Sequence, residues 1–396
     1  MERILTSELA AHAGERVLLQ GWLHRQRRLA NVAFVVLRDR AGLAQLVLDE
    51  PVELPAETVL EVRGHAVANA QAPGGVEVHE PEVRVIARPV EPPPLELHRP
   101  EPRESLQVRL DLAPLALTHP AVRERFRLTA RAVAAFRRTL DELGFVEVHT
   151  PKLVGAATEG GANVFRVDYF GGDAYLAQSP QLYKELVGVF ERVYEVGPAF
   201  RAEPHETGRH LSEFVSLDAE LGFIRDHRDV MAVVERCVLA MLDAVGQPAA
   251  GPIPVVHFAG VRSGEEPDLA PEDERRICAE HGELVFVEGF PTAKRAFYTH
   301  PGPEEPWSTG FDLLYRGVEI VSGSQRLHRH DDYLAALRER GLDPASFRGF
   351  LDAFRYGMPP HGGFAIGLPR FVAQALGVGN LRETTLFPRD RSRLVP

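Results

Sequence analysis

Alternation of apolar and polar residues between Glu195 and Phe223 constrains the fold of this chain more than any other feature. Successive side chains of a strand point to opposite faces, so a period of two predicts a hairpin of two strands with one face in a core. On the first strand, Arg201 and Glu203 share the polar face. The predicted core face carries Val196, Phe200, Ala202, Val215, Leu217, Ala219, Leu221 and Phe223.

The polar face of this hairpin gathers arginine and carboxylate side chains. The return strand contributes Ser216, Asp218 and Glu220, and the loop between the strands adds Arg209 and His210. The loop is too long for a tight turn, and loops of this kind commonly bind a ligand. Two interpretations stay open from these residues alone: a binding site, or the salt-bridged solvent face of a sheet.

Bulk properties narrow the class of protein. A chain of 396 residues favours two domains, and 44% hydrophobic with 26% charged residues is ordinary for a globular protein. The sequence has no run of about 18 apolar residues and no apolar leader, so we expect a cytoplasmic protein that does not enter a membrane. Cys237 and Cys278 are too few for a disulfide framework or a cysteine-based zinc site, so both are expected to be packing residues.

Charge composition gives two further hints. The net charge of -11 means that any contact with nucleic acid must be local, because phosphate binding normally needs a basic surface. Among 45 basic residues, only Lys152, Lys184 and Lys294 are lysines. A lysine in such a chain suggests a position where arginine does not fit.

Residues 1–88 read as a small β domain. Between Arg16 and Arg88 about five short strands alternate with turns, which fits a small barrel such as the OB-fold. A basic cluster from His24 to Arg28 lies beside Trp22 and Phe34, a combination that suits stacking on single-stranded bases. A solvated charged strand edge is the alternative.

Residues 89–118 and 119–396 differ in composition. The first segment is proline-rich and predicts a semi-rigid linker without packed elements. The second begins with a long helix from Ala121 that Gly144 ends, and its later helices and strands predict an antiparallel sheet flanked by helices. The fold class is therefore α+β. The sequence contains no glycine-rich phosphate loop of the Rossmann or P-loop kind.

Three segments in order resemble the motifs of class II aminoacyl-tRNA synthetases. FRAE…RHLSEF is similar to motif 2, GGFAIGLPR to motif 3, and the long helix through Pro151 to motif 1, the dimer element. The tail FPRDRSRLVP resembles the archaeal-type aspartyl enzymes, so the similarity spans the whole chain. The resemblance implies an N-terminal OB-fold that binds the anticodon, a class II catalytic domain, a homodimer, and tRNA, ATP and aspartate as substrates.

The resemblance also implies which residues bind ATP. Arg201 would contact the α-phosphate and Arg370 the γ-phosphate, as suits a fork-shaped cation. Phe214 would stack on adenine. The remaining contacts would come from Glu203, Arg209, His210, Leu211, Glu319, Gly367, Leu368 and Pro369. Amino-acid activation needs no protein base, because the substrate carboxylate is already ionised at neutral pH. Arg201, Glu203 and Arg370 are therefore expected to act by alignment and charge.

A magnesium ion is expected between the phosphates and Glu319, with Ser322 assisting. Glu319 and Asp312 lie on adjacent arms of a predicted hairpin that turns at Arg316-Gly317. Residues 319 and 322 would face opposite sides of a regular strand, so a bulge near Gly323 is required.

Aspartate recognition is implied for a second set of residues. Lys184 and Arg326 would face the side-chain carboxylate, and Glu159 and Asp218 would face the ammonium group. Ser179, Gln181, Arg201 and Ser322 would complete the pocket. Two cations would not be expected around the neutral amide of asparagine. A helix-surface position for Lys184 is the alternative.

Two positions of the first domain bear on tRNA choice. Relatives that charge only tRNA(Asp) place a tryptophan and a lysine around the anticodon, whereas this chain has His24 and Pro73. Both resemble the form that also charges tRNA(Asn). Two departures from the family pattern are a short region between 246 and 296 and Pro369 in place of an acidic residue. Rival hypotheses are a tRNA-independent asparagine synthetase paralogue and a non-catalytic nucleic-acid-binding paralogue.

Overall fold

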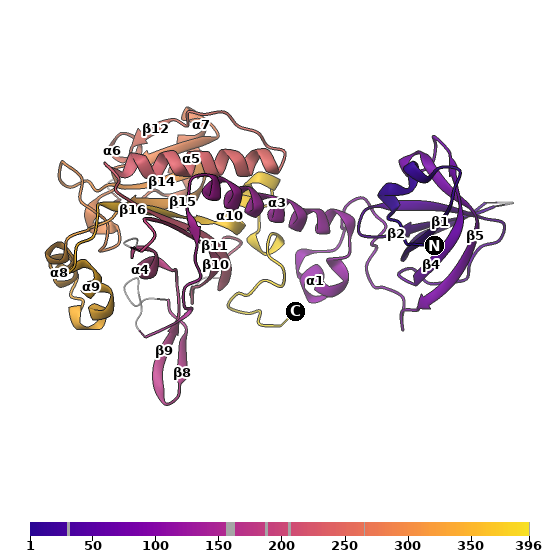
Figure 1. Ribbon diagram of the computed structural model, residues 1–396, viewed down its shortest axis with the longest axis horizontal. Helices are drawn as coiled ribbons and strands as arrows, with labels where there is room; N and C mark the ends of the chain where they lie inside the picture. Colours follow the sequence, from indigo (N-terminus) through magenta and orange to yellow (C-terminus); the bar gives the residue numbers. More distant parts are fainter. Residues whose placement is uncertain (30–31, 156–162, 187–188, 205–206, 265, 396) are drawn as a thin grey trace. The chain divides into compact units, whose positions relative to one another are not determined.

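The computed structural model describes residues 1–29, 32–155, 163–186, 189–204, 207–264 and 266–395 (Figure 1). The chain forms two compact units, Met1–Arg123 and Glu124–Pro396, and each is described by itself. Within the described residues, no helix combines the length and the apolar character needed to cross a bilayer.

The first unit contains a closed five-stranded barrel, with the strand order β1-β2-β3-β5-β4. Its strands are β1 (Arg16–Arg28), β2 (Ala33–Arg38), β3 (Leu43–Leu48), β4 (Val59–Ala68) and β5 (Val76–Ala87), with the 3-10 turns η1 (Thr6–His12) and η2 (Pro73–Gly75). Alternate apolar residues such as Leu19, Leu37 and Leu46 are fully buried inside the barrel. The predicted OB-fold barrel is therefore confirmed.

The proline-rich segment is more ordered than its composition suggested. It includes two short helices, α1 (Leu106–Asp111) and α2 (Ala113–Ala116), and a small buried cluster of Leu95, Leu97 and Ala116. The prediction of a segment without packed elements was wrong. Ser105 caps α1, and proline is tolerated in the first turn of α2, so prolines interrupt these helices less than a composition count implies.

The second unit is built on an eight-stranded sheet in the order β12-β13-β14-β15-β16-β11-β10-β6. Its strands are β6 (Val146–Glu147), β10 (Arg192–Phe200), β11 (Glu213–Gly222), β12 (Val255–His257), β13 (Leu284–Glu288), β14 (Gly310–Tyr315), β15 (Val318–Gln325) and β16 (His361–Gly367). The central pairs are antiparallel as predicted, and the outermost pair at each edge is parallel. A smaller sheet contains β7 (Leu153–Val154), β8 (Arg166–Tyr169) and β9 (Gly172–Leu176).

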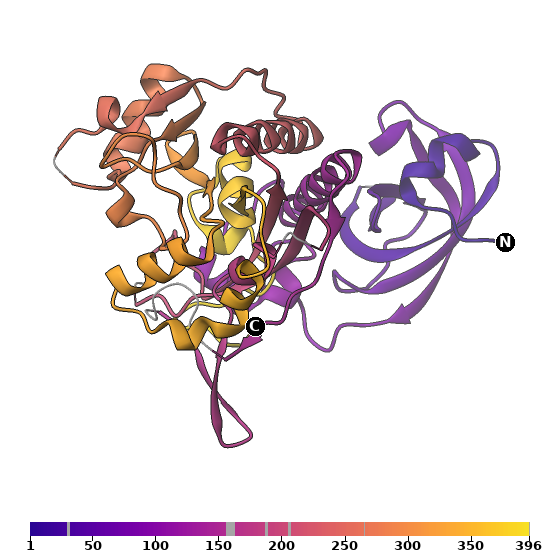
Figure 2. The same cartoon turned by 60° about the vertical axis from the view of Figure 1, so that its left-hand side comes forward.

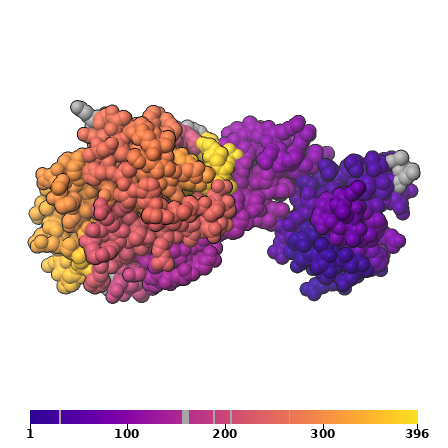
Figure 3. Space-filling model, turned by 90° about the horizontal axis from the view of Figure 1, so that it is seen from above, coloured from indigo at the N-terminus to yellow at the C-terminus, as the bar shows by residue number. Residues whose placement is uncertain are grey.

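Helices α3, α5 and α10 pack on one face of the large sheet (Figures 1 and 2). Asp226 caps the N-terminus of α5. Helix α3 ends at Glu142, and Gly144 follows it with a positive φ of +77°, as predicted for a helix stop. Helix α3 (Pro120–Glu142) begins at the end of the first unit. The other helices of the second unit are α4 (Gln181–Lys184), α5 (His227–Ala244), α6 (Phe258–Val261), α7 (Pro271–His281), α8 (His330–Glu339), α9 (Arg348–Phe354) and α10 (Leu368–Leu376), with 3-10 turns η3 (Thr292–Lys294), η4 (Pro344–Phe347) and η5 (Leu381–Glu383). Figure 3 is a space-filling view from above, in which coral and orange residues from the part of the chain that includes α5 and α7 form much of the surface of the second unit.

The predicted hairpin of β10 and β11 is present, and its register pairs Phe200 with Glu213. Leu217, Ala219 and Leu221 lie in the core, which leaves the polar residues of β11 on the opposite face. The alternation misassigned its two ends: Val215 and Phe223 are 38% and 69% exposed. Phe223 lies one residue beyond β11 with a positive φ of 59°, and Val215 lines an open groove beside α3.

Candidate active site

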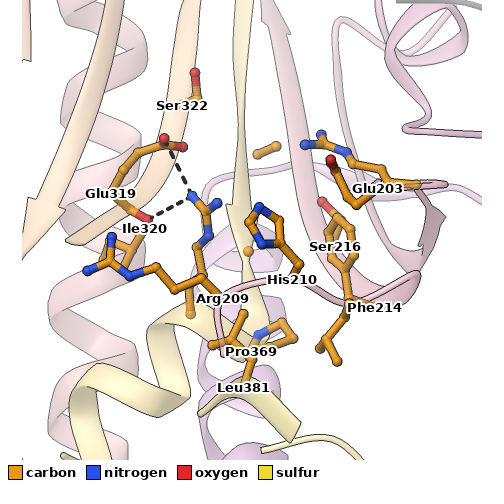
Figure 4. A pocket seen from close by; sticks show the side chains of 15 residues that line it. Glu203, Arg209, His210, Phe214, Ser216, Glu319, Ile320, Ser322, Pro369 and Leu381 are labelled. Carbon is orange, nitrogen blue, oxygen red and sulfur yellow. Dashed lines mark hydrogen bonds and ion pairs between the residues drawn. The ribbon is translucent and has the colours of Figure 1, made fainter. Parts of the chain in front are cut away.

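A pocket opens between the β10–β11 hairpin, β15 and the N-terminus of α10 (Figure 4). Glu319 and Ser322 lie on one side of it, and Glu203 and Phe214 lie on the other. Most residues predicted to bind ATP are brought together here. The lining is Arg201, Glu203, Arg209, His210, Leu211, Phe214, Ser216, Glu319, Ile320, Ser322, Ala365, Gly367, Pro369, Arg370 and Leu381.

The hairpin side of the pocket carries an arginine and an aromatic ring in contact. The guanidinium of Arg201 lies 5.5 Å from the ring centroid of Phe214. Nδ1 of His210 lies 2.7 Å from the hydroxyl of Thr207, which holds the imidazole in place. Leu211 is buried against α10 and Leu381, so the loop is anchored beneath the pocket. A planar ring beside a fixed cation suits a base and its phosphate.

Strand β15 contains the irregularity that the site requires. Leu313 pairs with Val321 and Leu314 pairs with Glu319, so Ile320 is an extra residue on β15. A bulge of this kind shifts the side-chain alternation by one residue, and Glu319 and Ser322 accordingly line the same pocket. The predicted bulge therefore exists, at Ile320 and not near Gly323.

Motif 3 presents Arg370 at the start of α10. Its Nη1 lies 3.4 Å from Oε2 of Glu319 and donates to the Glu319 carbonyl at 3.3 Å (Figure 4). Pro369 stands in the first turn of α10, where its missing N–H is of no consequence. Leu368 is buried in the sheet core and is not among the pocket-lining residues, unlike its neighbours Gly367 and Pro369.

Two carboxylates lie close together beside the pocket. Burial raises the pKa of Glu319, and the nearby Asp312 raises it further, whereas Arg370 opposes the shift. Asp312 is held by Arg295, whose Nη2 and Nη1 lie 2.8 and 3.0 Å from its oxygens. Arg295 also donates to the hydroxyl of Ser322 at 3.2 Å. Within the described residues no group of three His, Cys, Asp or Glu side chains could hold a metal ion alone.

Behind the pocket lies a buried group of charges on the polar face of β11 and β16. Nζ of Lys184 donates to Asp218 at 2.9 Å and to the carbonyl of Phe364 at 3.0 Å. Nε of Arg326 donates to Glu220 at 2.9 Å. Lys184 is 2% exposed and Arg326 is 4% exposed, so the helix-surface alternative for Lys184 is wrong.

The structure places the remaining predicted aspartate contacts near this group. Gln181 and Lys184 lie on α4, and the backbone N–H of Gln181 donates to the Ser179 hydroxyl at 3.3 Å. Asp218, predicted to face an ammonium group, here pairs with Lys184. Glu159 lies outside the described residues. The lining of the open pocket includes Arg201 and Ser322, but not the buried Lys184 and Arg326.

Sequence reasoning missed Arg295 and Glu274. Glu274, on α7, lies 3.8 Å from Arg209, and burial raises its pKa to about 7, with Glu319 contributing. No sequence pattern connects Arg295 or Glu274 with its partners, because each residue lies in a different segment of the chain from the residues that it contacts. Glu220 lies on the polar face of β11, as the alternation predicted, but the sequence did not predict its ion pair with Arg326.

In the first unit, the two positions tied to tRNA choice differ in environment. His24 is 8% exposed, and its Nδ1 lies 3.0 Å from Nη1 of Arg38. Burial, with Arg38 next, lowers the pKa of His24 to about 4. Pro73 begins η2 and is exposed. Trp22 is 40% exposed, and the Arg27 guanidinium lies 5.6 Å from the Phe34 ring centroid.

Comparison with known proteins assigns the family. The family model described as tRNA synthetases class II (D, K and N) matches residues 105–391, and the model for the OB-fold nucleic acid binding domain matches residues 17–86. The chain is a class II tRNA synthetase. The predicted family and fold class are confirmed, and ATP is a substrate of this family.

Full-length relatives of this synthetase carry two kinds of name. The aspartate–tRNA(Asp/Asn) ligases of Thermus thermophilus and Deinococcus radiodurans are 43% and 42% identical to it, over the whole of this chain and 100% and 99% of theirs. The asparaginyl-tRNA synthetase of Pyrococcus horikoshii, solved with asparaginyl-adenylate, superposes with a TM-score of 0.93 at 31% identity, covering both chains fully. The shared fold therefore does not by itself separate aspartate from asparagine.

Proposed function

We propose that this synthetase is an aspartate–tRNA ligase that activates aspartate with ATP and transfers it to tRNA. The buried cation pair of Lys184 and Arg326 carries the proposal, because a side-chain carboxylate is the group that two adjacent cations favour. A neutral amide cannot accept the charge-assisted hydrogen bonds that a carboxylate accepts from lysine and arginine. The Thermus and Deinococcus relatives support the same amino acid by their names.

The activation step needs alignment more than proton transfer. The α-carboxylate of aspartate forms a bond to the α-phosphorus of ATP, and the bond to the departing pyrophosphate breaks. Both reactants are anions, so the barrier falls when cations approach the oxygens that gain charge. Arg201, beside Phe214, and Arg370, beside Glu319, both line the pocket and are positioned to do this. Phe214 would hold the adenine and Glu203 would orient the nucleotide.

We propose that magnesium enters this pocket together with ATP. Mg²⁺ prefers one or two carboxylates combined with phosphate oxygens and water, and Glu319 with the Ser322 hydroxyl offers that kind of incomplete protein site. Bound there, the ion would neutralise phosphate charge. Asp312 is tied to Arg295, which leaves Glu319 as the principal ligand.

The domain assignments follow from this function. We propose that residues 1–88 bind the anticodon, residues 89–118 act as the linker, and residues 119–396 catalyse both steps. His24 and Pro73 support charging of both tRNA(Asp) and tRNA(Asn), since neither is the bulky or basic residue of the more selective relatives. The synthetase would act in the cytoplasm, where tRNA is used.

We also propose a homodimer. Apolar side chains of α3, β11 and the C-terminal tail line an open groove that includes Phe126, Val215, Leu386 and Phe387. Val215, Leu386 and Phe387 are each at least 38% exposed in the single chain. A second copy would bury this face, which includes the predicted motif 1 helix.

Charging assays with separate tRNA(Asp) and tRNA(Asn) transcripts test the proposal. We expect the purified protein to attach aspartate to both. Charging of tRNA(Asp) alone would overturn the dual specificity and leave the ligase activity intact. Formation of free asparagine without tRNA would establish the asparagine synthetase alternative, and absence of any aspartate-dependent reaction would favour the non-catalytic alternative.

A further inference from the structure

Glu185 is a fully buried carboxylate directly after α4, next to the proposed aspartate site. The hydroxyl of Tyr333, on α8, donates to its Oε2 at 2.5 Å. Nε2 of Gln181 donates to its Oε1 at 2.6 Å. These two neutral groups fix the orientation of the Glu185 carboxylate and connect α4 with α8.

The charges around Glu185 do not balance when all its neighbours are ionised. Lys184 and Arg326 supply two positive charges, whereas Asp218, Glu220 and Glu185 supply three negative ones. Asp218 pairs with Lys184, and Glu220 pairs with Arg326, each at 2.9 Å. Glu185 instead accepts from a phenol and an amide, so it is the carboxylate that loses least when it becomes neutral.

The electrostatic surroundings point in the same direction. The pKa of Glu185 is raised to about 7, with burial as the largest cause; Arg326 opposes the shift, Glu220 on β11 adds to it, and the hydrogen bonds from Gln181 and Tyr333 oppose it. His361 on β16 faces the same Glu220 and Arg326, and burial lowers its pKa. Glu185 is therefore poised between its two forms near neutral pH.

We propose that Glu185 is a specificity-determining residue that takes up one proton from solvent when the side-chain carboxylate of aspartate enters beside Lys184 and Arg326. The inference rests on the proposed function. The incoming carboxylate brings a fourth negative charge to a group that contains two cations. Protonation of Glu185 removes one negative charge, so the group returns to the net charge that it had before aspartate entered. The proton can be held on Oε2, beside the Tyr333 oxygen, while Oε1 still accepts from Gln181. The side chain of asparagine brings no charge, so its binding requires no proton uptake by Glu185.

The sign of the pH dependence follows. Well below pH 7 Glu185 is already protonated, so aspartate binds without proton uptake. Above pH 7 it is ionised in the free protein, so binding must be accompanied by protonation. Affinity for aspartate should then fall by up to about tenfold per pH unit between pH 7 and 8.5. Affinity for asparagine should stay constant, so discrimination against asparagine should weaken as pH rises.

Calorimetric titration of the full chain with aspartate, in buffers of different ionisation enthalpy, measures the proton directly. We expect close to one proton taken up per aspartate at pH 8 and close to none at pH 6. Glu185→Gln is permanently neutral and should show no uptake and a flat affinity from pH 7 to 8.5. Glu339→Gln, an exposed glutamate on α8, is the matched control and should behave as the native chain.

A second variant covers the case in which Glu185→Gln does not fold. Tyr333→Phe removes a donor that stabilises the ionised carboxylate, so the onset of proton uptake should move to higher pH. Equal uptake in native and Glu185→Gln protein, or no uptake by native protein at pH 8, would overturn the inference while aspartate binding upholds the proposed function. Failure to bind aspartate at any pH would instead count against the proposed function.

Discussion

Arg201 is the residue whose proposed role in the reaction can be tested most simply. It lies just beyond β10, at the pocket wall, with its guanidinium near Phe214. Electrostatic stabilisation works when the charge is fixed before the reaction, and the stacked ring and hairpin hold this one in place. Loss of the side chain should affect chemistry more than stability.

We predict that Arg201→Ala lowers aspartate-dependent pyrophosphate exchange by about 10²- to 10³-fold, the usual cost of one transition-state donor. The thermal midpoint should stay within about 2 °C, because no core contact is lost. Arg348→Ala, at an exposed position on α9, is the control and should retain full activity. An active Arg201→Ala protein would remove this residue from the mechanism.

Single residues also show what sequence can reveal. The scarcity of lysine correctly singled out Lys184, which is buried in an ion pair, and Lys152 likewise pairs with Glu195 at 2.7 Å. Lys294, however, is exposed, so scarcity alone does not identify a site. Motifs identified the residues that line the pocket. Partners such as Glu274 depend on how α7 packs, and periodicity within a segment carries no information about that.

At the scale of elements, strands β11, β15 and β16 form the floor of the site. The need for a bulge followed from the spacing of Glu319 and Ser322, but its position at Ile320 depends on the pairing of β14 with β15. Hairpin alternation likewise predicted the core face of β11 and failed at Val215, which lines an open groove beside α3, because alternation does not show what packs over a strand residue.

Close approach of β11 and β16 gives a prediction for Gly363. A Cβ at this position would lie 1.9 Å from Oε2 of Glu220 and 2.2 Å from the Ala219 carbonyl. Gly363→Ala should therefore destabilise the protein by about 3 kcal/mol in denaturant unfolding and weaken aspartate binding. Gly349→Ala on α9, where a Cβ meets nothing within 4 Å, should be neutral or slightly stabilising. Equal stability of the two variants would contradict the described strand packing.

The end of β13 and the start of α5 are joined by Glu288. Its oxygens lie 2.8 Å from His227 and 2.8 Å from Arg228, and hydrogen bonding from His227 is the main cause that lowers its pKa to about 2. The depressed pKa means that this carboxylate stabilises the fold above about pH 4.5, and that the contribution is lost as pH falls from about 4.5 toward 2.

We predict that Glu288→Gln lowers the free energy of unfolding by about 1–3 kcal/mol at pH 7 and flattens its decline below pH 4.5. Urea unfolding at a series of pH values measures both effects. Glu272→Gln, whose side chain is 76% exposed, should change neither. An acid profile of Glu288→Gln equal to that of the native chain would show that Glu288 does not form these ion pairs with His227 and Arg228.

On the scale of the whole molecule, a chain of net charge -11 must bind a polyanion through local surfaces. The first unit offers such a surface on β1, where Arg27 and Trp22 are exposed. The sequence predicted the fold of both units, because the first contains alternating short strands with turns and the second contains segments that resemble the class II motifs. It did not predict the two helices of the connecting segment, since proline content obscured the apolar residues that pack there.

The apolar groove predicts the assembly state. Light scattering should give twice the chain mass of 43.8 kDa, and Val215→Asp combined with Phe387→Asp should reduce it to one chain. Tyr356→Asp, at an exposed position beyond α9, should leave the mass unchanged. A native protein that elutes as a single chain at micromolar concentration would contradict the homodimer.

Amino-acid-dependent exchange of pyrophosphate into ATP tests the central claim most directly, because it measures activation of aspartate without tRNA selection. We predict exchange with aspartate at least about 100-fold faster than with asparagine, since charge complementarity at Lys184 and Arg326 is worth about 3 kcal/mol or more. Exchange that is equal with the two amino acids, or faster with asparagine, would contradict the assignment of the buried cations to the aspartate side chain.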